Sequence, residues 1–135
     1  MSFSLFFATS FKRSIKLLGK KYPHVKDDVR SALRILERSP YLGDVIPGSS
    51  GIRKLRIPNM DAARGKSGGY RLLYVVRANR ELIGLLLLYS KSEQTDVVRT
   101  ELIDLLRSLS QDLGENFVHE ERVEYQAESD APPSI

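Results

Sequence analysis

The chain has 135 residues, of which 41% are hydrophobic and 28% are charged, and this size and composition match one ordinary soluble domain. No apolar run reaches the ~18 residues of a membrane-spanning helix, and no charged segment precedes the short apolar start, so we expect a cytoplasmic protein without a signal peptide or membrane contact. The absence of cysteine excludes a disulfide framework and a thiolate nucleophile or metal ligand.

Charge is divided unevenly along the chain, which carries +4 in total. Residues 1–114 hold 20 basic and 11 acidic residues, net +9, whereas residues 115–135 hold six acids and one base, net −5. We therefore expect a basic domain at 1–114 followed by an acidic, flexible tail at 115–135. A basic domain suits nucleic acid, whose phosphates dominate affinity, but the same charge also occurs on ordinary solvated surfaces.

Two helices are predicted in the first third of the chain. They follow an apolar strand at residues 2–8. Ser10 is a suitable N-cap for a helix to about Lys20, and a second helix starts near Pro23 and stops at Ser39-Pro40. A short link between them predicts an antiparallel helical hairpin. Their apolar stripes have helical spacing: Phe11, Ile15 and Leu18 in the first, and Val25, Val29, Leu33 and Leu36 in the second.

Residues 41–51 are rich in glycine, proline and serine and are expected to form a loop. Strands are predicted at residues 52–58, 70–77 and 82–89, and their short connections favour an antiparallel meander. In the first of these, alternation places Lys54 and Arg56 on one open face, opposite the apolar side chains.

A third helix follows, capped by Thr95 or Thr100, with a leucine stripe from Leu102 to Leu113 and an end at Gly114. The predicted fold is therefore α+β, in the order β-α-α-β-β-β-α. A small, mostly antiparallel four-stranded sheet packs against an N-terminal helical hairpin and a C-terminal helix.

A basic turn punctuated by glycine, Gly65-Lys-Ser-Gly-Gly-Tyr-Arg71, leads into the strand at 70–77. Alternation points Arg71 away from Tyr70 and Tyr74, which we expect in the core or half-buried. An arginine in an apolar strand is costly unless its charge meets solvent, an anion or a partner. We interpret the chain as presenting Arg71 with Lys54, Arg56 and Lys91 around it. The alternatives are an ion pair of Arg71 with Glu93 or Asp96, and a plain exposed strand face for Lys54 and Arg56.

The element order, together with Ile52-Arg-Lys-Leu-Arg56, Gly65-Lys-Ser-Gly-Gly-Tyr-Arg71 and Tyr89-Ser-Lys-Ser-Glu93, resembles the RelE/ParE toxin superfamily, most of all its HigB/RelE-like branch. The resemblance runs from about Phe3 to Leu109. It implies the toxin of a type II toxin–antitoxin system, with an adjacent antitoxin of helix-turn-helix type as partner. It also implies a metal-independent endoribonuclease that cuts mRNA on the ribosome, without a cofactor.

Cleavage of RNA by its own 2′-hydroxyl needs a base, an acid and positive charge on the phosphate. Lys54 is the candidate base, Arg71 the phosphate ligand, Arg56 an added charge, and Lys91 the acid or a second phosphate contact. Arg64, Lys66 and Tyr89 are expected to bind substrate, with Tyr89 stacking a base or assisting proton transfer. The residues alone leave the assignment of acid and base open.

One departure from the RelE-like pattern concerns the residues after Lys91. Members often carry an arginine directly after it and a tyrosine one turn later, whereas this chain has Ser92 and Val97 or Val98 there. This favours a weakly catalytic member that binds nucleic acid or a partner. A further alternative is a ParE-like poison of DNA gyrase, against which the cations at 54, 56 and 91 argue.

Two further expectations concern the histidines and the tail. His24 and His119 are isolated and expected at the surface, and no cluster of histidine and carboxylates has the spacing of metal ligands, so no metal site is predicted. The acidic tail either lies over the basic cleft, competing with RNA phosphate, or is a solvated terminus.

Overall fold

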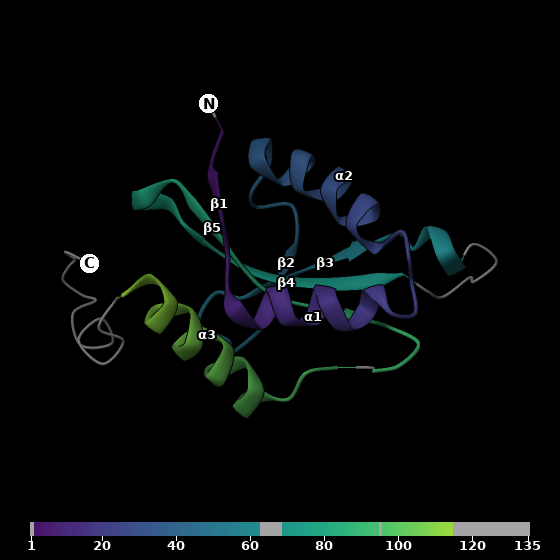
Figure 1. Ribbon diagram of the computed structural model, residues 1–135. Coiled ribbons are helices and arrows are strands. Elements are labelled where there is room, and N and C mark those ends of the chain that lie inside the picture. Colours follow the sequence, from purple (N-terminus) through teal and green to yellow (C-terminus); the bar gives the residue numbers. More distant parts are fainter. Residues whose placement is uncertain (1, 63–68, 95, 115–135) are drawn as a thin grey trace.

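The computed structural model describes residues 2–62, 69–94 and 96–114. Within these ranges the chain forms one five-stranded sheet and three α-helices (Figure 1). In chain order the elements are β1 (Ser4–Phe7), α1 (Thr9–Gly19), α2 (Val25–Arg38), β2 (Asp44–Val45), β3 (Arg53–Ile57), the 3-10 turn η1 (Met60–Ala62), β4 (Tyr70–Arg77), the 3-10 turn η2 (Ala78–Arg80), β5 (Leu82–Ser90) and α3 (Arg99–Leu113). No helix in the described ranges has the length and apolar character needed to cross a bilayer.

The sheet is mixed, with the strand order β1-β5-β4-β3-β2. Strand β1 runs parallel to β5, and the other pairs are antiparallel, so the predicted α+β class and mostly antiparallel sheet are confirmed. The predicted number of strands is too low by one. Strand β2 lies in the segment expected to be a loop, and it consists of two residues held by pairing of Asp44 with Lys54 and of Val45 with Arg53.

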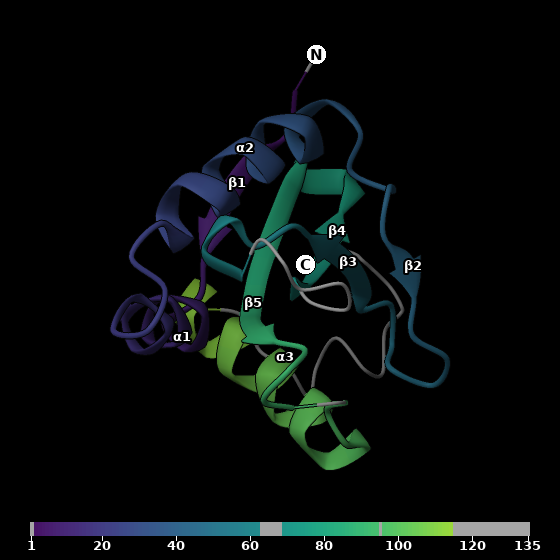
Figure 2. The same cartoon turned by 90° about the vertical axis from the view of Figure 1, so that its right-hand side faces the viewer.

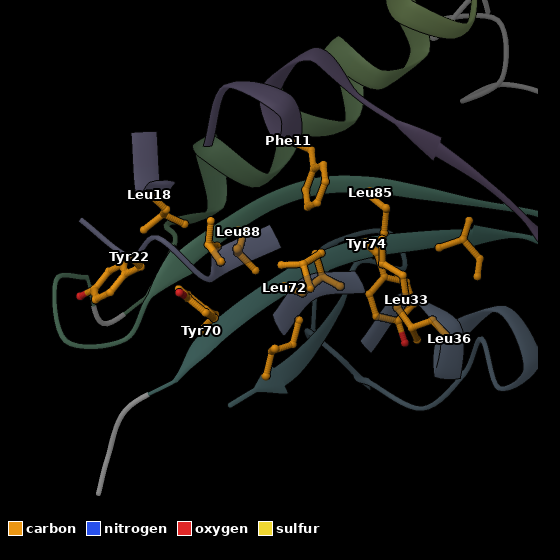
Figure 3. Close-up of a cluster of buried hydrophobic side chains, with 14 residues drawn as sticks. Phe11, Leu18, Tyr22, Leu33, Leu36, Tyr70, Leu72, Tyr74, Leu85 and Leu88 are labelled. Carbon is orange, nitrogen blue, oxygen red and sulfur yellow. The ribbon is translucent and has the colours of Figure 1, made fainter. Parts of the chain in front are cut away.

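Helices α1 and α2 cover one face of the sheet and form the larger hydrophobic core (Figure 3). The even-numbered side chains of β4 point into it, so Tyr70 and Tyr74 are fully buried, as predicted. The hydroxyl of Tyr74 accepts a hydrogen bond from the backbone of Gly43 at 2.8 Å, which ties the β2 segment to the core. The helices contribute the predicted stripes, namely Phe11 and Leu18 from α1, and Val25, Val29, Leu33 and Leu36 from α2.

Helix α3 packs against the opposite face and encloses a second core (Figure 2). Gly84 of β5 permits this approach, because a Cβ there would lie 2.8 Å from Cδ2 of the fully buried Leu109. A bulge opposite Leu73 and Tyr74 leaves Leu86 as an extra residue of β5 that also enters this core. The face carrying Lys54 and Arg56 is therefore less open than predicted: Leu73, which pairs with Lys54, is fully buried on it.

The starts of the helices differ from the sequence prediction, because tertiary contacts replace local caps. Helix α1 begins at Thr9, whose backbone N–H donates to Asp112 Oδ2 of α3 at 2.8 Å. The hydroxyl of Ser10, predicted as the cap, instead donates to the carbonyl of Leu86 at 2.6 Å. Helix α3 is preceded by Val98, whose N–H donates to Glu101, whereas Thr100 lies inside the helix and Thr95 lies outside the described residues.

Candidate functional site

Three of the predicted site residues form one row across three neighbouring strands, near the start of β4. Arg71 of β4 pairs with Arg56 of β3 on one side and with Tyr89 of β5 on the other. Directly paired residues share a face, with Cβ atoms ~4.5–5.5 Å apart. Two guanidinium groups and a phenol from three strands therefore lie at one level of the sheet, on the face that α3 also covers.

Two lysines extend this row. Lys54 lies two residues before Arg56 on β3 and therefore shares its face. Lys91 follows the end of β5, and its backbone N–H donates to the carbonyl of Gly69 at 3.1 Å, which continues the β4–β5 pairing beyond Tyr70. The structure thus brings Lys54, Arg56, Arg71, Tyr89 and Lys91 together around the start of β4. Arg64 and Lys66 lie outside the described residues.

Arg71 is the most buried of these cations, with 8% of its surface exposed. It points away from the core that contains Tyr70 and Tyr74, as alternation predicted, and its Nη1 donates to the carbonyl of Tyr70 at 3.3 Å. A guanidinium held this deeply loses part of its hydration, which strengthens its attraction for an anion that reaches it. Its rigid fork presents two parallel donors, as phosphate recognition requires.

Tyr89 lies beside Arg71 and is 5% exposed. Burial raises the pKa of its hydroxyl, the charge of Asp96 raises that pKa further, and the charge of Arg71 opposes both. Tyr89 is therefore a neutral phenol that can donate a hydrogen bond. Its burial favours a role as a donor beside Arg71 over stacking of a nucleotide base.

Asp96 is a residue of this site that the sequence analysis did not assign a role in cleavage. Its Oδ1 lies 3.3 Å from Nζ of Lys54, with the lysine side chain 36% exposed and the aspartate side chain 72% exposed. The pair links β3 to the segment that precedes α3, across 42 residues of sequence. The sequence analysis considered Asp96 only as a possible ion-pair partner of Arg71. In the structure, Asp96 forms an ion pair with Lys54.

The segment after β5 is anchored by Glu93, the other partner considered for Arg71. Its carboxylate accepts from Lys21 Nζ at 2.7 Å and from the hydroxyl of Tyr22 at 3.4 Å. The hydrogen bond and charge of Glu93 raise the pKa of Lys21, and the same contact lowers the pKa of Glu93. The backbone at Lys91 is therefore held by its pairing with Gly69 and by the ion pair of Glu93 two residues later.

Glycine is required at position 69, where the basic turn enters β4. Its φ of +82° is a conformation that other residues rarely adopt, and a Cβ would lie 2.7 Å from the carbonyl oxygen of Ile57. The predicted need for glycine before Arg71 is thus confirmed at Gly69, whereas Gly65 and Gly68 lie outside the described residues.

The positions that depart from the RelE-like pattern have structural roles of their own. Ser92 Oγ lies 2.9 Å from Ser90 Oγ, Val97 packs against the core under α3, and Val98 precedes that helix. Among the residues that the structure describes, no group of three or more histidine or carboxylate side chains is arranged to hold a metal ion.

Comparison with known proteins identifies solved structures that share this fold. No family model matches the sequence. The E. coli toxin RelE, in the free state and with two arginines replaced by alanine, matches with a TM-score of 0.51 and 17% identity, over 84% of this chain and 99% of that one. The toxin–antitoxin complex RelBE2 of Mycobacterium tuberculosis matches with a TM-score of 0.50 and 23% identity, over 66% of this chain and 98% of that one. The chain therefore has a RelE-like fold, as its motifs indicated.

Proposed function

We propose that this chain is the toxin of a type II toxin–antitoxin pair and cleaves mRNA on the ribosome without a metal ion. The observation that carries the proposal is the row of Arg56, Arg71 and Tyr89 across three strands, flanked by Lys54, on a fold shared with RelE toxins. A short row of cations of this kind suits a single phosphodiester group better than an extended duplex.

The proposed reaction is an internal transfer within the RNA chain. The 2′-oxygen forms a bond to the adjacent phosphorus, the bond from phosphorus to the 5′-oxygen breaks, and the products carry a 2′,3′-cyclic phosphate and a 5′-hydroxyl. One protein group takes the 2′ proton and another supplies a proton to the 5′-oxygen. Negative charge grows on the phosphate oxygens during this step, which is where fixed positive charge lowers the barrier most.

Arg71 holds two of the phosphate oxygens in this proposal, since its burial and planar fork provide oriented donors with little freedom. Arg56, directly opposite and exposed, adds charge and contacts the RNA strand. Lys54 and Lys91 approach the reacting atoms from two sides and carry the proton transfers or further phosphate contacts. Tyr89 donates from its neutral hydroxyl beside Arg71.

A second candidate function is a weakly catalytic member that binds RNA or a partner. The observation in its favour is the contact of Asp96 with Lys54, since a carboxylate at the site repels phosphate and occupies the lysine. Ser92 and the two valines at the departing positions support the same reading, because serine lacks the positive charge of arginine and valine has no group that transfers a proton.

The partner proposed for this chain is an antitoxin made by an adjacent gene, and the place of action is the cytoplasm, where ribosomes translate. The RelBE2 neighbour is itself a toxin–antitoxin complex. Co-expression with the product of an adjacent small gene should restore growth and yield a stable complex on purification. Growth inhibition that no neighbouring gene product relieves would remove this part of the proposal.

The chemistry is tested with purified ribosomes programmed with a defined mRNA. Cleavage should require the ribosome, persist in a chelator that leaves ribosomes intact, and produce 5′-hydroxyl ends that a kinase can label directly. The weakly catalytic alternative predicts RNA binding without such ends, and a gyrase poison predicts damaged DNA with intact mRNA.

A further inference from the structure

An apolar groove lies on the opposite side of the molecule from the cationic row. It runs between β1, α1 and α2 and encloses about 440 Å³, against the ~30 Å³ that one water occupies. The most exposed apolar residue of its lining is Phe7, which is 40% exposed and stacks on Phe11 with ring centroids 5.7 Å apart. The apolar lining is Leu5, Phe7, Phe11, Ile15, Val29 and Leu33.

The rim of this groove is mainly basic. Lys26, Arg30 and Arg34 line it from α2 at intervals of four residues, so they follow one another along one side of the helix. Arg30 also contacts Asp27 at 3.1 Å in an exposed pair, and Glu37 completes the lining. The rim suits a segment whose apolar side chains are flanked by carboxylates.

The chain's own acidic tail has this composition. Phe117, Val118, Val123 and Tyr125 are its large apolar residues, and Glu120, Glu121 and Glu124 lie between them. Arg122 is the one basic residue after position 114. Apolar contact and opposite charge would therefore act together when this segment meets the groove.

The last turn of α3, after which the tail follows in sequence, is bound to the start of α1. Asp112, near the end of α3, accepts hydrogen bonds from the backbone N–H and the hydroxyl of Thr9, at 2.8 and 3.2 Å. Thr9 lies between Phe7 and Phe11 in sequence, and both of these line the groove. From Gly114, where α3 ends, to Phe117 is three residues, which can span up to about 10 Å, and from Thr9 to Ile15 along α1 is about 9 Å.

We propose that residues 117–125 dock in this groove in the same molecule, with their aromatic residues against Phe7 and Ile15 and their carboxylates on the basic rim. A segment joined by so short a connection meets its site at an effective concentration of about millimolar, so weak contacts suffice. The groove is on the α1–α2 side, and Arg71 points to the α3 side. Docking here keeps the carboxylates away from the cationic row, in contrast to a tail that covers the row.

Disulfide trapping tests this placement, because the natural chain has no cysteine. We would introduce His119→Cys in the full chain together with Arg34→Cys on the rim. The matched control pairs His119→Cys with Leu42→Cys, which replaces an exposed residue before β2 at the other edge of the sheet. Under one oxidant, docking predicts an intramolecular bond at least about tenfold faster for the rim pair than for the control. Arg30→Cys serves as a second rim position if the Arg34→Cys chain folds poorly.

Adding Phe117→Ser and Tyr125→Ser to the rim pair should slow bond formation to the control rate, and 0.5 M salt should slow it partly, by screening the rim charges. Equal rates for rim and control pairs would overturn the proposal. So would bonds that form only between two molecules, which would place a second copy's tail in the groove. The readout involves no RNA, so this proposal and the proposed nuclease activity can fail independently.

Discussion

The ammonium group of Lys54 lies 3.3 Å from the carboxylate of Asp96, beside the row of side chains proposed to bind RNA. The two residues belong to β3 and to the segment before α3, and their contact places a negative charge where a phosphate is expected to bind. An exposed pair of this kind contributes little to folding. Its larger effect is on the electrostatic attraction for RNA, because a carboxylate competes with phosphate for the same lysine.

Replacing Asp96→Asn should therefore tighten RNA binding. We expect affinity about two- to fivefold higher at low salt, corresponding to up to about 1 kcal/mol for an exposed pair. The measurement is fluorescence anisotropy with a short single-stranded RNA across a salt series. Asp27→Asn, which removes the same charge from α2 on the other side of the sheet, should have a smaller effect. Equal effects from the two variants would mean that net charge, and not the contact with Lys54, limits binding.

Gly69→Ala should destabilise the fold, because the added Cβ would lie 2.7 Å from the Ile57 carbonyl at a φ of +82°. The expected loss is about 1–3 kcal/mol in the free energy of unfolding, measured by denaturant titration. Gly19→Ala provides the matched control, since a Cβ there meets its nearest neighbour at an ordinary 3.9 Å. That control should be neutral or slightly stabilising at the end of α1. A Gly69→Ala variant as stable as the Gly19→Ala variant would contradict the geometry of the turn.

An ion pair between His24 and Asp61 should make stability depend on pH. Nδ1 of His24 lies 2.7 Å from Asp61 Oδ1, and the backbone N–H of His24 donates to Asp61 Oδ2 at 2.8 Å. The hydrogen bond that the His24 ring donates to Asp61, followed by the charge of Asp61, raises the pKa of His24, and the hydrogen bonds from His24 lower the pKa of Asp61. The pair thus anchors η1, which precedes the basic turn, to the start of α2.

The two shifts define a window of pH. The contribution of His24 is fully present below its ordinary pKa of 6.5 and is lost as pH rises through the raised folded value. The contribution of Asp61 is present above its ordinary pKa of 3.8 and is lost as pH falls through the lowered folded value. The stability difference between the natural chain and His24→Gln should therefore be largest between these two pH values and decline as pH rises above 6.5. A difference that stays constant from pH 5 to pH 9 would show that the pair does not titrate in this way.

The sequence predicted the elements whose hydrophobic spacing is regular. The stripes of α1, α2 and α3 and the alternation in β4 place their side chains in the expected cores, and Gly114 ends α3 with a φ of +76°. The gathering of Arg56 around Arg71 was also predicted, from the alternation of side chains in two strands. Their direct pairing was not, because the twelve residues between β3 and β4 leave the register open.

The features that sequence did not predict depend on contacts between distant residues. Strand β2 has two residues and exists because β3 lies beside it, and Asp112 replaces Ser10 at the start of α1 across about one hundred residues. The pair of Lys54 with Asp96 has the same origin, since neither residue carries a local signal for the other. The parallel pairing of β1 with β5 likewise follows from how α1 and α2 return the chain to the sheet.

Arg71→Lys should reduce cleavage strongly while the fold is retained, because lysine keeps the charge but lacks the fork with two donors. Arg71→Ala should reduce the cleavage rate further, on the order of 100- to 1000-fold for loss of an oriented donor to a developing negative charge. Lys54→Ala and Lys91→Ala should each cause a clear loss. Circular dichroism and thermal unfolding establish that each variant is folded before rates on programmed ribosomes are compared.

Arg77→Ala is the matched control for position 71. Arg77 is on the same strand and the same side of it, six residues further on and therefore about 20 Å away. Its replacement removes the same charge and should leave cleavage within about twofold of the natural chain, as expected for a surface change distant from the site. Equal losses from Arg71→Ala and Arg77→Ala would assign the effect to overall charge.

Primer extension on cellular mRNA, before and after induction of the chain, tests the central claim most directly. The account predicts new, discrete 5′ ends inside translated reading frames within minutes of induction. It also predicts that these ends are absent when translation initiation is blocked and when the Arg71→Ala variant is induced to the same level. Growth arrest with no new mRNA ends, or the same ends after induction of a folded Arg71→Ala variant, would contradict it.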